Sequence, residues 1–197
     1  MYDIIIRNAR IIDGTGAPWY YGDLAVKDGV IAAMGKLGTC SARETVDAAG
    51  LALSPGFIDI HCHGAFGFDT NDANEEGLRA WTKGIVTEGT TALLATTITQ
   101  SEEVLTKAVA NVAKVMEDGY EGAEILGIHF EGPYLDMLYK GAQPEQHIVK
   151  GTIEQFERYQ KAAKGNIKLI TMATETDEDF ELTRYLADKG IVVSIGH

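Results

Sequence analysis

The sequence SPGFIDIHCHG occupies positions 54–64 and predicts a strand that ends in two histidines. Its proline-glycine pair is a turn signal, and the mostly apolar run Phe57–Cys62 is typical of a strand buried on both faces. Side chains alternate across a strand, so Asp59, His61 and His63 share one face. The two imidazoles are about 6.6 Å apart along the strand, and both can reach one divalent cation. The stretch therefore suggests a metal site.

A single His-x-His pair is a weak signal by itself, because two inward histidines can also be hydrogen-bonded residues of a core. Its position favours the metal interpretation. The pair stands where the strand stops and Gly64 and Gly67 open a loop. In parallel α/β folds, ligand sites gather at the carboxyl ends of the strands.

Residues 1–53 have a β-rich pattern and predict a small antiparallel sheet. Short apolar runs at 2–6, 9–12, 23–27 and 30–34 are separated by glycine and aspartate turns. Asp28-Gly29 lies between two of these runs and is a strong hairpin signal. The segment contains no histidine, so we interpret residues 1–53 as a small β domain and residues 54–197 as the catalytic one.

From residue 54 onward the pattern changes to alternating strands and helices. We predict strands at 57–62, 90–97, 124–131, 167–173 and 191–197, with helices near 75–88, after the N-cap residues Ser101 and Thr152, and over 177–189. Each later strand follows a helix that can cross back over a parallel sheet. This is typical of a (β/α)8 barrel or of an open doubly wound sheet. No G-x-G-x-x-G motif follows the first strand, which argues against a dinucleotide fold.

The composition is typical of a soluble globular protein. With 45% hydrophobic residues, the 197-residue chain can bury a sizeable core, and its net charge of −12 argues against general binding to nucleic acid or anionic membranes. We find no signal segment, and no apolar run reaches the ~20 residues of a membrane span. Two cysteines, Cys40 and Cys62, are too few for a disulfide framework, so we expect a reducing, cytoplasmic location.

Metal-type ligands lie at the ends of three predicted strands. His61 and His63 end the first strand, Glu131 the third and His197 the fifth. Imidazole nitrogen and carboxylate oxygen are ligands that zinc takes at about 2.0 to 2.2 Å, and a catalytic zinc site keeps one position open for water. Because the carboxyl ends of parallel strands share one edge, we expect these four residues to form one metal site.

We expect three other polar residues near the candidate ligands to have roles other than binding the metal. His129 has the same parity as Glu131 and should point inward, where we expect it to support the ligands and not to bind the metal itself. Asp59, one pleat below His61, is interpreted as a buried hydrogen-bond partner. His147 lies in a long loop, and we place it on the surface or at the rim of a substrate site.

Several motifs resemble those of the amidohydrolase superfamily. PGFIDIHCH at 55–63 follows a β-rich segment that contains NARIIDG at 8–14. Within that superfamily, HFEGPY at 129–134, KGAQP at 140–144 and VSIGH at 193–197 are similar to the branch that deacetylates amino-sugar 6-phosphates. The resemblance covers essentially the whole chain.

The resemblance implies a fold and an activity. The fold is a metal-dependent (β/α)8 TIM-type barrel, of which the first five strands are present here, fused to a small β-sandwich. The activity is hydrolysis of the N-acetyl amide of an amino-sugar 6-phosphate, a small-molecule substrate, with N-acetylglucosamine 6-phosphate giving glucosamine 6-phosphate and acetate. The expected cofactor is zinc, with iron as the alternative, as one or two ions.

The resemblance also assigns residues. Glu131 and His197 match the family's metal ligands, and His61 and His63 match the pair found in members with a second metal. Ala142 and Gln143 match a substrate-contacting loop. The family's general acid is an aspartate from a late barrel strand, which the resemblance places beyond residue 197. We therefore expect an incomplete, inactive enzyme here and a homodimer for the full-length protein.

Two alternative functions are open at this point. One is another amidohydrolase activity, such as that of a D-aminoacylase or a dihydroorotase. The other is a non-catalytic metal-binding half barrel that pairs with a second copy or a partner, since an open half barrel leaves unpaired edge strands.

Overall fold

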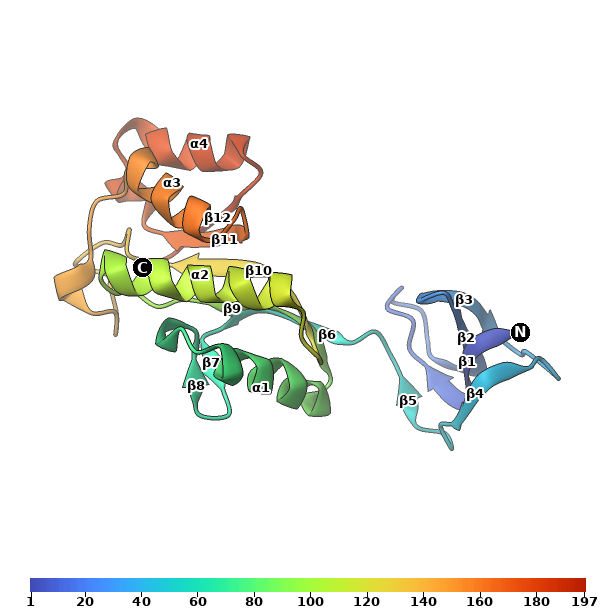
Figure 1. Cartoon of the computed structure of the whole chain (residues 1–197). Coiled ribbons are helices and arrows are strands. Elements are labelled where there is room, and N and C mark those ends of the chain that lie inside the picture. The colour runs from blue at the N-terminus through green and yellow to red at the C-terminus, as the bar shows by residue number, and fades with distance from the viewer. The chain divides into compact units, whose positions relative to one another are not determined.

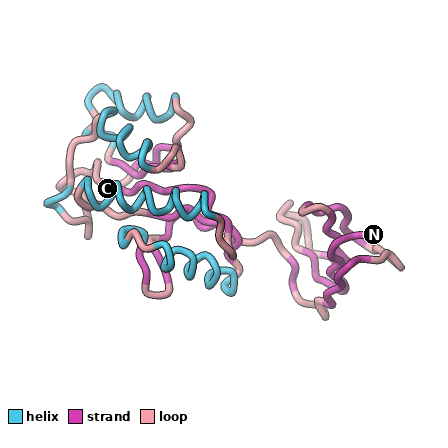
Figure 2. Tube along the Cα trace, viewed as in Figure 1, coloured by secondary structure: helices cyan, strands magenta, loops and turns pink.

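The computed structural model describes residues 1–197, which form two compact units, Met1–Gly56 and Phe57–His197 (Figure 1). The first unit contains only strands and loops, and the second alternates strands with helices (Figure 2). None of the helices combines the length and the apolar character of a membrane span.

The first unit is a single five-stranded sheet of mixed direction. Its strands are β1 (Tyr2–Ile11), β2 (Tyr20–Lys27), β3 (Val30–Gly35), β4 (Ala42–Asp47) and β5 (Ala52–Leu53). β1, β2 and β3 pair antiparallel, whereas β4 and β5 pair parallel to β1. The predicted runs do pair antiparallel, but the sheet is not antiparallel throughout, because β4 and β5, which were not predicted as strands, run parallel to β1. The reason is that the segment after β3 returns the chain to the start of β1, where Ala42 pairs with Tyr2.

The hairpin between β2 and β3 confirms its sequence signal. Asp28 and Gly29 connect the strands with φ angles of +52° and +77°. Two successive positive φ angles are typical of a type I′ turn, whose twist matches that of the flanking strands. β1 is one strand where the sequence shows two runs, because a bulge between Ile6 and Ala9 lets the ladder continue.

The second unit is built on five parallel strands in the order β12-β11-β10-β9-β6. The strands are β6 (Phe57–Cys62), β9 (Thr90–Thr96), β10 (Glu124–Glu131), β11 (Ile167–Met172) and β12 (Val192–Ile195). The helices are α1 (Glu75–Ile85), α2 (Glu102–Asp118), α3 (Ile153–Ala162) and α4 (Glu181–Asp188). A small hairpin of β7 (Gly64–Ala65) and β8 (Phe68–Asp69) follows β6. Short 3₁₀ turns lie at Thr70–Asp72, Val86–Glu88, Glu145–His147, Thr174–Thr176 and Glu178–Phe180.

The strand order distinguishes between the two predicted architectures. A doubly wound sheet reverses its strand order at a switch point. Here the strands of the five-stranded sheet follow one another in chain order from one edge to the other, and a helix lies between each of them and the next (Figure 1). The second unit is therefore the first part of a (β/α)8 barrel.

Alternate residues of the central strands face different environments. Ile128 and Phe130 of β10 and Ile170 of β11 belong to the hydrophobic core that the helices complete. Full burial of such side chains contributes about 1.5–3 kcal/mol each. His129 and Glu131 have the opposite parity, so they lie on the inner face of the curled sheet.

Two helices begin where their sequence signals predict. Ser101 Oγ accepts a hydrogen bond from the Val104 N–H (3.4 Å) at the start of α2, and Thr152 Oγ1 accepts one from the Gln155 N–H (3.2 Å) at the start of α3. The Gln155 side chain donates to Glu102 and does not return to the cap. Only one half of the predicted capping box therefore forms.

The last helix begins at Glu181 and not at residue 177 as predicted. Asp177 accepts hydrogen bonds from the backbone N–H groups of Leu182 and Thr183, so it caps the helix from outside. Phe180 has a φ angle of +56°, which interrupts the helical path between the cap and the helix.

The prediction that β6 is buried on both faces is wrong. Phe57, Ile58 and Ile60 are 70%, 62% and 54% exposed. β6 is the edge strand of its sheet, pairs only with β9, and contributes none of these three residues to the hydrophobic core. Within residues 57–197, β6 is the outer strand of a half barrel, so no further strand lies along its free edge.

Candidate metal centre

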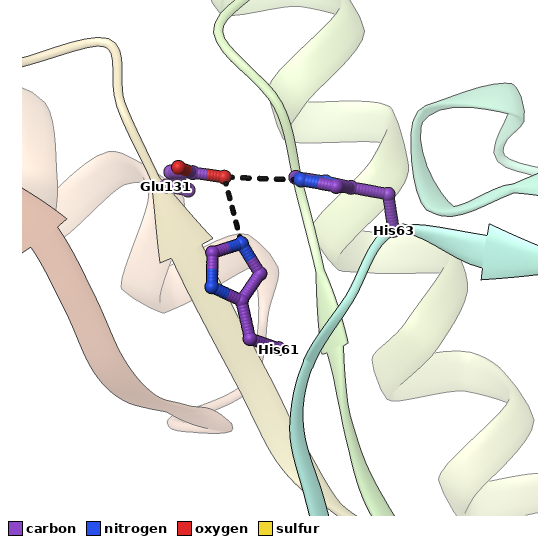
Figure 3. A group of neighbouring side chains, drawn as sticks. All are labelled: His61, His63 and Glu131. Carbon is purple, nitrogen blue, oxygen red and sulfur yellow. Dashed lines mark hydrogen bonds and ion pairs between the residues drawn. The ribbon is translucent and has the colours of Figure 1, made fainter. Parts of the chain in front are cut away.

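Glu131 is the centre of the candidate site. It is the last residue of β10 and is only 3% exposed. Three histidine Nε2 atoms lie against its carboxylate: His61 at 3.2 Å and His63 at 3.1 Å from Oε2, and His197 at 3.0 Å from Oε1. Figure 3 shows the rings of His61 and His63 converging on one end of the carboxylate. The structure thus brings together the four residues that the sequence singled out as ligands.

Local contacts shape the end of β6 so that both of its histidines reach the carboxylate. The ladder between β6 and β9 is irregular between Asp59 and Cys62. Asp59 Oδ1 accepts from the His61 N–H at 3.0 Å, and Thr96 Oγ1 accepts from the Cys62 N–H at 3.0 Å. These side chains satisfy backbone groups that have left the ladder. Asp59 is half-buried rather than buried, and the hydrogen bond it accepts comes from the backbone.

The charges around Glu131 fit a cation. Burial raises the pKa of Glu131, but the hydrogen bond from His63 and the charges of the surrounding histidines outweigh burial and bring the pKa to about 2. The same hydrogen bond raises the pKa of His63. Imidazole lone pairs and a carboxylate are both electron-rich, so they converge at these distances only around protons or a metal ion. Three imidazoles and one carboxylate form a donor set that suits a divalent metal.

Glu131 lies between a pair of histidines, His61 and His63, and a single histidine, His197. The ligand atoms of His61, His63 and Glu131 all lie within 4.8 Å of one another. His197 contacts the other carboxylate oxygen, and its Nδ1–H donates to the backbone oxygen of Lys140 at 3.1 Å. Because a carbonyl oxygen can only accept, this contact places the proton on Nδ1 and leaves Nε2 free to act as a ligand.

His129 lies beneath the site and is 2% exposed. Its Nδ1–H donates to the backbone oxygen of Ile60 at 2.9 Å, and its Nε2 lies 2.8 Å from Thr171 Oγ1. Burial, followed by the charge of His61, lowers the pKa of His129 to about 4. The ring is therefore neutral near pH 7, and protein groups occupy both of its nitrogens.

The loop predicted to contact substrate passes beside His197. A Cβ atom on Gly141 would lie 3.6 Å from the His197 ring, and Ala142, the next residue, is exposed. Gln143 is buried, and its Oε1 accepts from the Thr99 N–H at 3.0 Å. His147 is half-buried in its 3₁₀ turn and is not among the groups that contact Glu131.

Two groups at the site were not predicted from the sequence. Thr171 on β11 meets His129 through its hydroxyl, and the backbone oxygen of Lys140 meets His197. Thr171 is a polar residue near the end of an apolar strand, with a parity that faces inward, and this pattern could have revealed it. Every residue has a backbone carbonyl, so the sequence gives no signal for the contact at Lys140.

Comparison with known proteins identifies the family. The model of the Amidohydrolase family matches residues 52–185, more than half of the chain. The chain belongs to the amidohydrolase family. Three of the four residues around the candidate site of this amidohydrolase, His61, His63 and Glu131, lie within the matched range.

Individual relatives of this amidohydrolase are deacetylases. The N-acetylglucosamine-6-phosphate deacetylase of Bacillus subtilis is 42% identical over 158 residues, which are 79% of this chain and 40% of the relative. The deacetylase of Lysinibacillus sphaericus is 36% identical over 194 residues, 98% of this chain and 50% of the relative. The crystal structure of the deacetylase from Pasteurella multocida matches 98% of this chain and 50% of its own, with a TM-score of 0.83 and 30% identity. The chain spans about half the length of the curated relatives it matches.

Proposed function

We propose that this amidohydrolase site removes the N-acetyl group from an amino-sugar 6-phosphate, converting N-acetylglucosamine 6-phosphate into glucosamine 6-phosphate and acetate. The observation that carries the proposal is the convergence of three Nε2 atoms on the buried Glu131 carboxylate at the carboxyl edge of a parallel sheet. The relatives support the choice of substrate.

We propose His61, His63, Glu131 and His197 as the metal ligands. Zinc suits this set of nitrogen and oxygen donors best, with iron as the alternative. One carboxylate oxygen faces the histidine pair and the other faces His197. With this division, the four residues would hold one ion or two.

The site supplies the charge that amide hydrolysis requires. A bound divalent cation polarises an amide carbonyl and lowers the pKa of a water molecule towards about 7. With a pKa of about 2, Glu131 stays ionised and holds a full negative charge against the cation at neutral pH. The carbonyl of Lys140 keeps the proton of His197 on Nδ1, away from the site.

A general acid must also protonate the leaving amine. The two carboxylates at this end of β6 and β10 already have partners: Glu131 contacts the histidines, and Asp59 accepts from the His61 N–H. We therefore propose that residues 1–197 hold the metal but do not complete the reaction alone. Ala142 and Gln143 are the proposed sugar contacts, supported by the passage of their loop beside His197.

A chimera tests this function. Residues 1–197 replace the matching half of the Lysinibacillus sphaericus deacetylase, which aligns with 98% of the chain. We expect the chimera to release acetate from N-acetylglucosamine 6-phosphate. Glu131→Gln in the chimera should lower that activity at least about 100-fold, because it removes the negative charge that the three histidines face. The chain alone should be inactive.

The controls separate the alternatives. Glu175→Gln changes an exposed carboxylate just past β11 and should leave activity unchanged. A chimera that hydrolyses N-acyl-D-amino acids in preference to the sugar phosphate would contradict the proposed substrate. A folded chimera that binds metal and hydrolyses neither substrate would favour a non-catalytic metal module.

We also propose a cytoplasmic location and a homodimeric complete enzyme. Cys40 and Cys62 are both free, which suits a reducing compartment. The dimer rests on the family resemblance. Light scattering of the active chimera tests it, and a monomeric mass would contradict it.

A further inference from the structure

We propose that His129 and Thr171 form a positioning pair that fixes the two ligand-bearing edge strands, β6 and β12, relative to Glu131. The inference rests on the proposed metal site and deepens it. Neither residue would contact the metal or the substrate. Both act through the histidines that do.

The ligands come from strands that are not neighbours. His61 lies on β6 and His197 follows β12, at opposite edges of the sheet, while Glu131 lies on the central β10. Ladder hydrogen bonds connect only adjacent strands. The ladder of β6 is also irregular between Asp59 and Cys62, where His61 stands. Another contact must therefore hold the end of β6 at its distance from β10.

His129 makes that contact by reaching past β9. Its Nδ1–H donates to the backbone oxygen of Ile60, the residue before His61, at 2.9 Å. Its ring also packs edge-on against the His61 ring, with centroids 4.7 Å apart and planes at 75°. His129 is 2% exposed, so water does not compete for this bond and its geometry is strongly enforced.

Thr171 fixes the proton on the His129 ring. A carbonyl oxygen can only accept, so His129 Nδ1 carries the hydrogen and Nε2 accepts from the Thr171 hydroxyl at 2.8 Å. The hydrogen bonds run in one direction, from Thr171 through His129 to Ile60. Without the hydroxyl, His129 Nε2 is a buried acceptor with no partner, which costs free energy. If the proton moves to Nε2 instead, the ring loses its hydrogen bond to the Ile60 oxygen.

Thr171 also contacts the residues beside Glu131 and His197. Its backbone oxygen accepts from the N–H of Gly132, directly after Glu131, at 3.2 Å. Its Cγ2 would lie 2.8 Å from a Cβ atom at position 196, so glycine there lets the end of β12 come this close. Gly196 directly precedes His197. The pair therefore contacts the residues next to His61, Glu131 and His197.

A valine substitution with a matched control tests the pair. Thr171→Val removes the hydroxyl at nearly constant shape. Thr97→Val does the same to another buried threonine, whose hydroxyl has no hydrogen-bond partner. The 197-residue chain is titrated with Zn²⁺ in competition with a chelator. We expect Thr171→Val to weaken Zn²⁺ binding by about 10 to 100-fold, the usual cost of losing a group behind a ligand, and Thr97→Val to change it less than threefold.

A metal-independent readout accompanies the titration. ¹⁵N NMR of the histidine rings should show the His129 proton on Nδ1 in the metal-free wild type and in Thr171→Ser, which keeps the hydroxyl. In Thr171→Val, the His129 ring should exchange between tautomers and the His61 ring resonances should shift. Thr97→Val should leave both rings as they are in the wild type.

The outcomes separate the two proposals. Equal Zn²⁺ affinities for Thr171→Val and Thr97→Val would overturn the positioning pair. A His129 proton on Nε2 in the wild type would do the same. If the wild type binds no Zn²⁺ at all, the proposed metal site fails in this chain, and the tautomer and the His61 shifts still decide whether His129 and Thr171 position that strand.

Discussion

Among single residues of the first unit, Asp23 is a carboxylate that contacts several separate segments, as Glu131 does in the second unit. Its side chain is 15% exposed and pairs with Arg7 at 2.8 Å. It also accepts from the backbone N–H groups of Asn8 and Leu37. Burial raises the pKa of Asp23, but these hydrogen bonds and the charge of Arg7 together hold the pKa below its usual value. One carboxylate thus joins β1, β2 and the segment after β3.

We predict that Asp23→Asn destabilises the first unit by about 1–2 kcal/mol at pH 7, the usual cost of losing hydrogen bonds to a charged group. The pKa of Asp23 is lower in the folded state, so its stabilisation is complete above the unfolded value of about 3.9. It is lost as the pH falls through the folded value. The difference between wild type and variant should therefore shrink between pH 5 and pH 2. Urea unfolding followed by Trp19 fluorescence, in a Trp81→Phe background, measures it.

Glu44→Gln is the matched control, because it removes an exposed carboxylate from β4 of the same sheet. It should change stability by less than about 0.5 kcal/mol at either pH. A constant difference between wild type and Asp23→Asn across this pH range would contradict the role given to the ionised carboxylate.

At the scale of elements, α2 shows how a local signal and a packed face act together. Ser101 caps its first turn, and Glu102 and Glu103 follow where the helix dipole favours negative charge. Leu105 and Val109, one turn apart, are fully buried against the rest of the core. The cap fixes where the helix begins, and the buried face fixes how it lies on the sheet.

We predict that Ser101→Ala lowers the stability of the second unit by about 1 kcal/mol, because one N–H of the first turn loses its acceptor. Ser101→Asn should retain most of the wild-type stability, since its side chain can accept the same bond. Urea unfolding followed by Trp81 fluorescence, in a Trp19→Phe background, measures both variants. Equal losses for alanine and asparagine would show that the cap itself contributes nothing.

At the scale of the whole molecule, the candidate site lies entirely within one of the two units. All four proposed ligands belong to residues 57–197, and none belongs to the first unit. A ligand that binds only the folded state stabilises the part of the chain that holds it. Metal binding should therefore act on the two units unequally.

We predict that free Zn²⁺ at 100 times its dissociation constant stabilises the second unit by about 2.7 kcal/mol. Unfolding reported by Trp81 should move to higher urea, while unfolding reported by Trp19 should not. A chelator should reverse the shift. Equal shifts at both tryptophans would mean that the units unfold together, and a shift only at Trp19 would contradict the location of the site.

Features that depend on near neighbours in the chain could be predicted from the residues alone. Asp28-Gly29 set the hairpin, Ser101 and Thr152 set two helix starts, and the alternation of side chains put His61 and His63 on one face. The regular order of strands and helices also predicted a parallel sheet of β/α units, but it left the barrel and the doubly wound sheet both open. These results follow from backbone geometry with a fixed period, which needs no knowledge of the packed fold.

Which distant groups meet could be seen only in the folded chain. In residues 1–197, Ile58 and Ile60 of β6 are exposed at a sheet edge, and an apolar run by itself does not say which segments lie alongside it. No sequence pattern indicated that His129 would reach Ile60 past the intervening strand β9. Nor did any pattern indicate that Thr171 would determine which His129 nitrogen carries the proton. These contacts depend on the curvature of the sheet, which arises from twist and packing accumulated over many residues. Curvature brings together groups that no local rule connects.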